Sequence, residues 1–297
     1  MNIHLDCIPC FLRQALEAAR RATSDPAEHE QMLRDVLAMT SEMNLSESPP
    51  MVGQRIHRRL RALTASDDPY AEIKAKFNQV ALDLRPEMAA RVAAHADPLA
   101  AAVQLAIAGN LIDLGPNGKI TEEDARRDML RLSEEPIQGD LEEFRRAVAD
   151  ARSILYLTDN VGEIVFDQPL VAMLPPDRVT VAVRGRPVIN DATLEDAETA
   201  GLTELVEVVD NGADAQGPEL ADCSEDFRAR FRAADCIIAK GQGNFETLSE
   251  EPANIFFLFK AKCPVIATHA GVPLGAHVLL RSRAATATPG PAQPVSA

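Results

Sequence analysis

Hydrophobic positions recur every three or four residues in the first half of the chain, a period that predicts helices. After the cap-and-proline start Asp25-Pro26, for example, Met32 and Val36 fall on the same helical face. Further helix starts are predicted at Ser48-Pro49-Pro50, Asp68-Pro69, Pro86, Pro98 and the capping-box pattern of Thr121. We therefore expect residues 1–145 to form a mainly helical domain.

The hydrophobic period changes after Ser153, where short β-branched runs begin to alternate with helical segments, as in parallel βαβ units. Four runs each lead into small polar and charged residues: Ile154-Leu157 into Thr158-Asp159-Asn160, Val179-Arg184 into Asn190-Asp191, Leu205-Val209 into Asp210-Asn211-Gly212, and Cys236-Ala239 into Lys240-Gly241-Gln242-Gly243-Asn244. This pattern predicts a Rossmann-like α/β domain with a mostly parallel sheet over residues 146–283. Residues 284–297, rich in Ala, Thr and Pro, are predicted to be a disordered tail.

The polar clusters follow strands whose carboxyl ends would face one crevice of a parallel sheet. Asp159 and Asn160 follow the first run, Asp191 follows the second, and Lys240 ends the fourth. Carboxylate and amide oxygens suit a hard divalent cation, and an ammonium group can balance phosphoryl charge. The sequence therefore predicts a site for a divalent cation and a phosphate, although Asp159 or Asn160 could instead cap the following helix.

Three other polar segments have structural alternatives. Asp210-Asn211-Gly212 is more easily explained as a turn than as a ligand group. The glycines after Lys240 would let backbone amides approach an anion, but the segment lacks the Gly-Lys-Ser/Thr ending of a nucleotide-binding Walker loop. Gly109-Asn110-Leu111-Ile112-Asp113 ends an apolar helix and is either a helix C-cap with a turn or a part of the site.

The charge balance narrows the classes of partner. The chain has 30 basic and 45 acidic residues, a net charge of −15, which disfavours nucleic acid and anionic lipid surfaces as partners. A phosphorylated ligand would then need a local focus of positive charge. The longest mostly apolar stretch, Leu99 to Ala108, is too short to span a membrane, and no signal-peptide pattern opens the chain. We therefore expect a cytoplasmic protein without a membrane or nucleic-acid partner.

The five cysteines agree with a reducing compartment, because the number is odd and three of them are scattered through the predicted sheet domain. Cys7 and Cys10 form a CxxC pair at the start of an amphipathic helix. The pair could be redox-active or half of a zinc site, but no second CxxC or histidine pair follows. Structural packing is the alternative.

Several sequence blocks together resemble the metal-dependent damage-control phosphatases, the family also called domain of unknown function eighty-nine. The blocks are Asp6-Cys7-Ile8-Pro9-Cys10, Pro49-Pro50 leading to Ile56-His57-Arg58, Asp68-Pro69-Tyr70, Lys74 with Asn78, Gly109-Asn110-Leu111-Ile112-Asp113, Asp159-Asn160-Val161-Gly162-Glu163-Ile164-Val165-Phe166-Asp167, Val188-Ile189-Asn190-Asp191-Ala192-Thr193, and Lys240-Gly241-Gln242-Gly243-Asn244-Phe245-Glu246-Thr247-Leu248. The resemblance covers about residues 2 to 280, and the early CxxC is similar to the mostly prokaryotic branch.

The resemblance implies roles for individual residues. Asp159, Asn160 and Asp191 would hold a divalent ion (Mn, Mg, Co or Ni), and Lys240 would contact the phosphoryl group. Substrate-binding positions would be Asn110, Asp113, Glu163, Asn190, Gly241 and Asn244. Cys7 and Cys10 would be structural or hold a second metal. The active site would then lie in the cleft between the helical and the α/β domain.

We therefore expect a metal-dependent phosphomonoester hydrolase that acts on a small phosphorylated metabolite. One alternative is an S-adenosylmethionine-dependent carboxyl methyltransferase, although the segment after Asp159 offers one glycine where such folds commonly have several. Another alternative is a metal-binding protein without turnover. The sequence predicts neither the substrate nor the oligomeric state.

Overall fold

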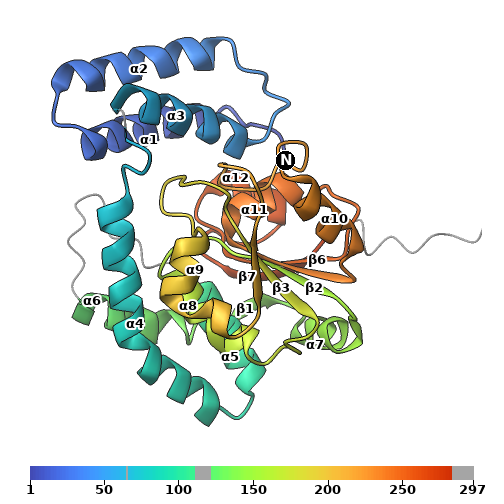
Figure 1. The fold of residues 1–297 in the computed structure, drawn as a ribbon. Coiled ribbons are helices and arrows are strands. Elements are labelled where there is room, and N and C mark those ends of the chain that lie inside the picture. Colours follow the sequence, from blue (N-terminus) through green and yellow to red (C-terminus); the bar gives the residue numbers. More distant parts are fainter. Residues whose placement is uncertain (65, 111–121, 283–297) are drawn as a thin grey trace, which may run out of the picture.

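A computed structural model describes residues 1–64, 66–110 and 122–282, and its centre is one seven-stranded sheet (Figure 1). The strand order is β1-β7-β6-β5-β2-β3-β4. The strands are β1 (Ile137–Gly139), β2 (Ile154–Leu157), β3 (Val179–Val183), β4 (Glu207–Asp210), β5 (Cys236–Lys240), β6 (Ile255–Lys260) and β7 (His277–Arg281). Only the pairing of β6 with β7 is antiparallel among the described strands. The predicted mixed α/β fold with a mostly parallel sheet is confirmed.

Helices cover both faces of the sheet and form a separate layer at the N-terminus (Figure 1). They are α1 (Cys7–Ala22), α2 (Pro26–Ser41), α3 (Pro49–Thr64), α4 (Ala71–Ala94), α5 (Pro98–Gly109), α6 (Glu122–Leu132), α7 (Leu141–Asp150), α8 (Glu163–Val171), α9 (Leu194–Ala200), α10 (Glu225–Ala233), α11 (Gly241–Leu248) and α12 (Pro264–Ala270), with a short 3-10 helix at Leu202–Glu204. No described helix is long and apolar enough to cross a membrane.

The alternating side chains of β2 separate two hydrophobic cores. Ile154 and Tyr156 face a core that they share with α4, α5 and α8, whereas Leu155 and Leu157 face a core formed with α10, α11 and α12. A third cluster joins α1, α2 and α3, and Ile73 of α4 packs against both this cluster and the first core. The sheet is therefore the middle of three layers, as expected for a parallel sheet whose faces are both buried.

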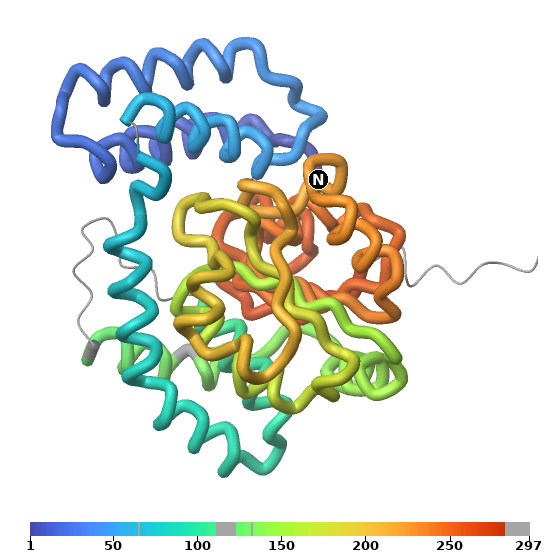
Figure 2. The backbone as a smooth tube through the Cα atoms, viewed as in Figure 1, coloured from blue at the N-terminus to red at the C-terminus, as the bar shows by residue number. Residues whose placement is uncertain are grey.

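The cores do not divide at residue 145, where the sequence predicts the domain boundary. Helices α4 and α5 belong to the core on one face of the sheet, and β1, at residues 137–139, pairs with β7. Only α1 to α3 have a core of their own. Figure 2 shows α4 as the connection between the N-terminal layer and the sheet.

Some predicted elements differ from the structure. Pro86 does not start a helix but lies inside α4, where Leu84, Met88 and Val92 are buried along the same helix. Burial of this face keeps α4 continuous although proline removes a backbone donor. The strands β1, β6 and β7 are not among the predicted runs, and the part of β6 from Ile255 to Phe259 is a buried apolar run that periodicity cannot distinguish from a helix. The predicted cap at Thr121 and the tail over 284–297 lie outside the described residues.

A buried carboxylate fixes the N-terminal layer to the loop that follows β4. Asp214 accepts hydrogen bonds from Gln54 at 2.8 Å, from Arg58 at 2.6 Å and from Arg61. All three donors lie on α3, so one carboxylate holds this helix in place. As a result, the layer of α1 to α3 is attached near the carboxyl ends of β3 and β4.

The direction of winding reverses between β2 and β5. The chain proceeds from β2 to β3 and β4 on one side, and then crosses over to β5 and β6 on the other side. The two neighbours are parallel, with Leu157 opposite Ala239. In open α/β sheets a crevice opens at such a switch point, beyond the carboxyl ends of the strands, and ligands bind there.

Candidate active site

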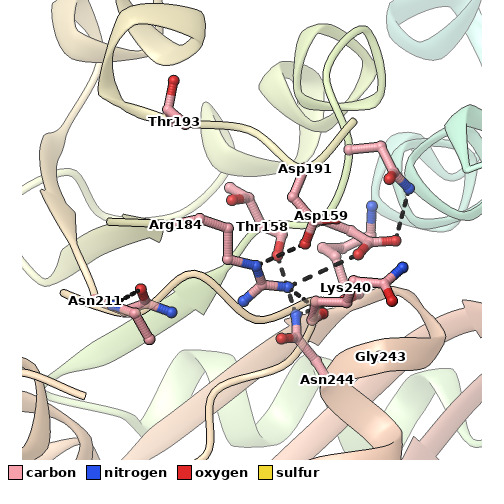
Figure 3. Close-up of polar contacts among 12 residues, drawn as sticks. Thr158, Asp159, Arg184, Asp191, Thr193, Asn211, Lys240, Gly243 and Asn244 are labelled. Atoms are coloured by element: carbon pink, nitrogen blue, oxygen red, sulfur yellow. Dashed lines mark hydrogen bonds and ion pairs between the residues drawn. The ribbon is translucent and has the colours of Figure 1, made fainter. Parts of the chain in front are cut away.

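Two aspartates from successive β–α connections converge on one arginine at the switch point (Figure 3). Arg184 Nε donates to Asp191 Oδ2 at 2.7 Å, and Arg184 Nη2 lies 3.8 Å from Asp159 Oδ1. The arginine is itself held by a hydrogen bond from Nη2 to the Gln216 carbonyl at 2.6 Å. All three charged side chains are buried. Arg184 therefore lies between the two carboxylates and offsets part of their combined negative charge.

Backbone pairing brings the two predicted ligand segments together. Asn160 and Asp191 form an isolated antiparallel bridge, supported by hydrogen bonds from Val161 N to Asn190 O at 2.8 Å and from Ala192 N to Asp159 O at 2.9 Å. The backbone hydrogen bonds alone thus hold the segment of Asn160 in register with the segment of Asp191.

The backbone beside this bridge is unusual. Ile189 has a φ of 46°, the only positive φ outside glycine among the described residues. Such a conformation in a branched residue is strained, and strained residues cluster at functional sites.

Neither Asp159 nor Asn160 caps the helix α8 with its side chain, which was the alternative to a role in the site. The N-cap of α8 is Gly162, with a φ of 69° and no side-chain cap. The Asn160 amide donates instead to Asp159 Oδ2 at 2.7 Å and to Glu163 Oε2 at 3.1 Å. The side chains of Asp159 and Asn160 thus serve the site rather than the helix terminus. By contrast, the turn at Asp210-Asn211-Gly212 is confirmed, because Gly212 N donates to Asp210 Oδ1 at 2.9 Å.

Asn110 reaches the site from the end of α5. Its Nδ2 donates to Asp159 Oδ2 at 2.6 Å and to Glu163 Oε2 at 2.7 Å. Its Oδ1 is buried and has no hydrogen-bond partner among the described residues. Asn110 is also the C-cap of α5, so one residue both ends this helix and contacts Asp159, and its contact with a substrate stays a prediction.

Lys240 lies beneath the carboxylates and is fully buried. Its ammonium donates to Glu163 Oε1 at 2.6 Å, to Asp167 Oδ1 at 2.6 Å and to the Ala106 carbonyl at 2.8 Å. Burial alone would lower the pKa of Lys240, but Asp167 and Glu163 raise it, so the side chain stays charged. Three acceptors match the three donors of an ammonium group. A contact with phosphate would require the release of one partner, and it stays a prediction.

The glycine after Lys240 allows the close approach of Asp159. Gly241 has a φ of 78°, and a Cβ at this position would overlap the Asp159 carboxylate. Asn244, on the next turn, donates to the Thr158 carbonyl at 3.0 Å and to the Lys240 carbonyl at 2.6 Å. The segment therefore fixes the end of β5 against the end of β2.

The electrostatics of the site are those of crowded, buried carboxylates. Burial and the neighbouring Glu163 raise the pKa of Asp159 to about 6, although Arg184 opposes this shift. Burial raises the pKa of Asp191 to about 8, again against Arg184 and with Asp159 adding to the shift. A single arginine does not compensate both negative charges. The site is therefore suited to an additional cation.

A cleft of about 700 Å³ opens above these residues, between the N-terminal layer and the carboxyl end of the sheet. Of the predicted site residues, Asn110, Asp159, Asn160, Asn190 and Asp191 line it together, and Cys7 and Cys10 line it from α1. Glu163, Lys240, Gly241 and Asn244 are buried behind its surface. For this second group the placement favours a supporting role over direct contact with a ligand. Asp113 lies outside the described residues.

Three residues near the site are not among the predicted site residues, although Asp167 ends one of the sequence blocks that carry the family resemblance. Arg184 ends the second β run, and its position next to the polar cluster was the available signal. Asp167 lies one helical turn after Glu163, which places both acids on the side of α8 that faces Lys240. Lys262 lines the cleft just after β6, a strand that the sequence analysis did not identify.

The donor set matches the metal that the sequence predicts. Asp159, Asp191 and the amide oxygen of Asn160 are oxygen ligands of the kind that hard divalent ions prefer. The Oδ1 of Asn110, which is buried and has no hydrogen-bond partner among the described residues, is a further oxygen on a side chain that contacts Asp159. No three His, Cys, Asp or Glu side chains of residues 1–64, 66–110 and 122–282 are arranged to hold a metal ion. A metal here would therefore depend on amide oxygens as well as on the aspartates.

Known proteins resemble this chain over nearly its full length. Residues 3–278 match the family model described as "Damage-control phosphatase ARMT1-like domain". The chain is 35% identical over 289 residues to a damage-control phosphatase of Pyrococcus horikoshii, which covers 95% of this chain and 99% of the relative. It is 35% identical over 283 residues to a damage-control phosphatase of Archaeoglobus fulgidus, with 93% and 97% covered.

A solved structure agrees with this assignment. The crystal structure of a DUF89 family protein from Pyrococcus horikoshii has a TM-score of 0.86 and 35% sequence identity to this chain, and it covers 95% of this chain and 100% of that one. Sequence and fold thus give the same result. The chain belongs to the damage-control phosphatase family with the ARMT1-like domain, as its motifs predict.

Proposed function

We propose that this protein is a metal-dependent phosphomonoester hydrolase that acts on a small phosphorylated metabolite in the cleft. The observation that carries the proposal is the convergence of Asp159, Asn160 and Asp191 on the floor of this cleft, at the switch point of the sheet. Relatives that are named damage-control phosphatases support the reaction class.

The cofactor would be a divalent ion such as Mn, Mg, Co or Ni, held by Asp159, Asn160 and Asp191. When bound, such an ion would polarise a phosphoryl oxygen and neutralise charge that develops during transfer. The cluster of buried carboxylates is otherwise unfavourable, because among residues 1–64, 66–110 and 122–282 Arg184 is the one cation that pairs with Asp159 and Asp191 within 4 Å. Hydrolysis would therefore depend on added metal.

The side chains of the protein have distinct roles in this proposal. Arg184 orients Asp191, and Asn110 orients Asp159 through a 2.6 Å hydrogen bond. Lys240 holds Glu163, which in turn accepts hydrogen bonds from Asn110 and Asn160. These contacts keep the carboxylates in place before the substrate arrives, and such preorganisation is a large part of catalysis by charged groups.

The volume and the lining of the cleft also indicate the size and the kind of substrate. Its volume of about 700 Å³ exceeds the space that a phosphate group needs, and apolar and aromatic residues such as Tyr70 and Phe77 form part of its wall. Helix α1 covers the opposite side. A small metabolite would thus be enclosed with its phosphate toward Asp159 and its remainder toward α1 and α4.

The proposal is tested by a screen of phosphorylated metabolites with purified protein, repeated with each divalent ion and with a chelator. We expect phosphate release that requires metal. Turnover that persists in the chelator would contradict metal dependence. Methyl transfer from S-adenosylmethionine without phosphate release would favour the methyltransferase alternative, and stoichiometric metal binding without any turnover would favour the non-catalytic one.

A further inference from the structure

The burial of Lys240 leaves the phosphate of the proposed substrate without an evident cationic side chain as a partner beside the proposed metal ion. Its ammonium is occupied by Glu163, Asp167 and the Ala106 carbonyl, and the side chain has no exposed surface. Arg184 is likewise engaged, with Asp191 and with the Gln216 carbonyl. A protein with a net charge of −15 needs a local positive group to attract an anion.

Lys262 is the lysine that lines the cleft within the described residues. It follows β6 at the carboxyl end of the sheet, and its side chain is exposed. Its Nζ donates to the Asn110 carbonyl at 2.8 Å, the one hydrogen bond found for this ammonium within the described residues. An ammonium group has three donors, so two remain for a ligand.

The hydrogen bond to Asn110 also gives Lys262 a defined position relative to the carboxylates. The side chain of Asn110 contacts Asp159 at 2.6 Å, and its carbonyl holds Lys262. The main chain of Lys262 is fixed as well, because its N–H donates to Gln242 Oε1 at 3.2 Å. A single residue therefore connects the cation on the cleft wall with the carboxylate on the cleft floor.

The other cations along the cleft are less suited to this task. Arg13 lies on α1, and its guanidinium donates to Cys10 Sγ at 3.2 Å. Arg21 is near the other end of the same helix and has a partner of its own. Both lie on α1, whereas Lys262 directly follows a strand of the sheet whose carboxyl end carries the aspartates.

We propose that Lys262, rather than Lys240, is the residue that contacts the phosphoryl group of the substrate. The inference rests on the proposed phosphatase function, and it assigns to Lys240 the separate task of holding Glu163 and Asp167. Because Lys262 is exposed and its ammonium makes a single hydrogen bond to the described residues, it can turn toward an anion without leaving a buried charge unpaired. The same exchange at Lys240 would leave buried carboxylates unpaired.

The test compares three variants: Lys262→Met, Lys262→Arg and the control Lys260→Met. Lys260 precedes Lys262 by two residues and lies toward Arg131 and Glu135 rather than on the cleft wall. Calorimetry would measure the binding of inorganic phosphate with and without Mn²⁺, and steady-state kinetics would measure KM and kcat on an accepted substrate. Exposed lysines can be replaced with little effect on folding.

We expect Lys262→Met to weaken phosphate binding and to raise KM by about tenfold or more, the effect of losing one hydrogen bond to a charged group. Lys262→Arg should recover most of the affinity, and Lys260→Met should resemble the parent. Unchanged phosphate affinity in Lys262→Met would overturn the inference, as would an absence of phosphate binding in the parent. If the parent binds phosphate but releases none from any substrate, the proposed function fails, and loss of binding in Lys262→Met still supports the inference.

Discussion

Lys240 and Glu163 form an ion pair of 2.6 Å in which neither side chain is exposed. Asp167 forms a second pair with the same ammonium at 2.6 Å. Removing one partner of a buried ionic group leaves uncompensated charge and costs about 3–5 kcal/mol, far more than the loss of a surface contact. The cluster of Lys240, Glu163 and Asp167 is therefore the least replaceable support of the site.

Lys240→Met should lower the free energy of unfolding by about 3–5 kcal/mol, because two buried carboxylates lose their cation. Urea denaturation would measure the change. Adding Asp167→Asn to this variant should restore part of the stability, since one of the two unpaired charges is then removed. A variant that is as stable as the parent yet fails to bind phosphate would instead favour direct contact between Lys240 and the phosphoryl group.

Asp159→Asn and Asp191→Asn should each reduce metal-dependent phosphate release to near background while the circular dichroism spectrum stays that of the parent. Each change removes a negative charge from the proposed metal ligands but keeps the size of the side chain. Asp177→Asn, at an exposed aspartate outside the cleft, is the matched control. Full activity in either of the two variants would remove that aspartate from the metal site.

Gly241→Ala should impair the site more than the fold. Both Gly241 and Gly271 have a positive φ, of 78° and 74°, so alanine at either position costs about 1–2 kcal/mol in backbone strain. At Gly241 the added Cβ also overlaps the Asp159 carboxylate, whereas at Gly271 it meets no atom within 4 Å. We expect Gly241→Ala to lose metal-dependent turnover and Gly271→Ala to keep it. Equal turnover in the two variants would mean that the approach of Gly241 to Asp159 is not needed.

His57 should make the protein less stable in mild acid. Burial, with a smaller effect of Arg61, lowers the pKa of His57 from 6.5 to about 4. Between these values the unfolded chain binds the proton and the folded protein does not, so the free energy of unfolding falls as the pH drops from 6.5 toward 4. At 1.36 kcal/mol for each pKa unit, the contribution is about 3 kcal/mol.

His57→Gln should remove this contribution, so that the parent and the variant differ in the slope of stability against pH within that window. Other groups titrate there too, including His277, whose pKa burial lowers to about 4, but they are common to both proteins. The difference therefore isolates His57. Urea denaturation at several pH values would provide the comparison, and parallel curves for parent and variant would show that His57 is not neutral in the folded state.

The parts of the site that could be predicted from the sequence are those encoded locally. An apolar run followed by Asp159-Asn160 marks a strand and the residues beyond its end, and the same holds for Asn190-Asp191. Parallel pairing then brings them together, as the bridge between Asn160 and Asp191 shows. No long-range information was needed for this step.

The remaining parts depend on contacts that no local pattern encodes. The burial of Lys240 requires the Ala106 carbonyl, 134 residues away in the chain, and is therefore invisible in the glycine-rich segment that follows the lysine. Lys262 is not a predicted site residue because the strand that it follows, β6, is an apolar run up to Phe259, and such a run does not identify itself as a strand. A proline commonly marks the start of a helix, so the sequence predicts a new helix at Pro86. In the structure α4 continues through Pro86 because its buried side chains pack in the core, and this packing has no signal in the local sequence.

The reversal of winding between β2 and β5 also determines when the site can form during synthesis. The neighbour of β2 on that side is β5, which the ribosome delivers only after β3 and β4, and the hydrogen bond from Lys262 to Asn110 joins residues 152 positions apart. A nascent chain that ends before β5 would carry both aspartates but neither lysine. The complete cleft can thus form only after β6 and Lys262 have been synthesised, and fragments that end before β5 should be unable to bind a phosphorylated ligand.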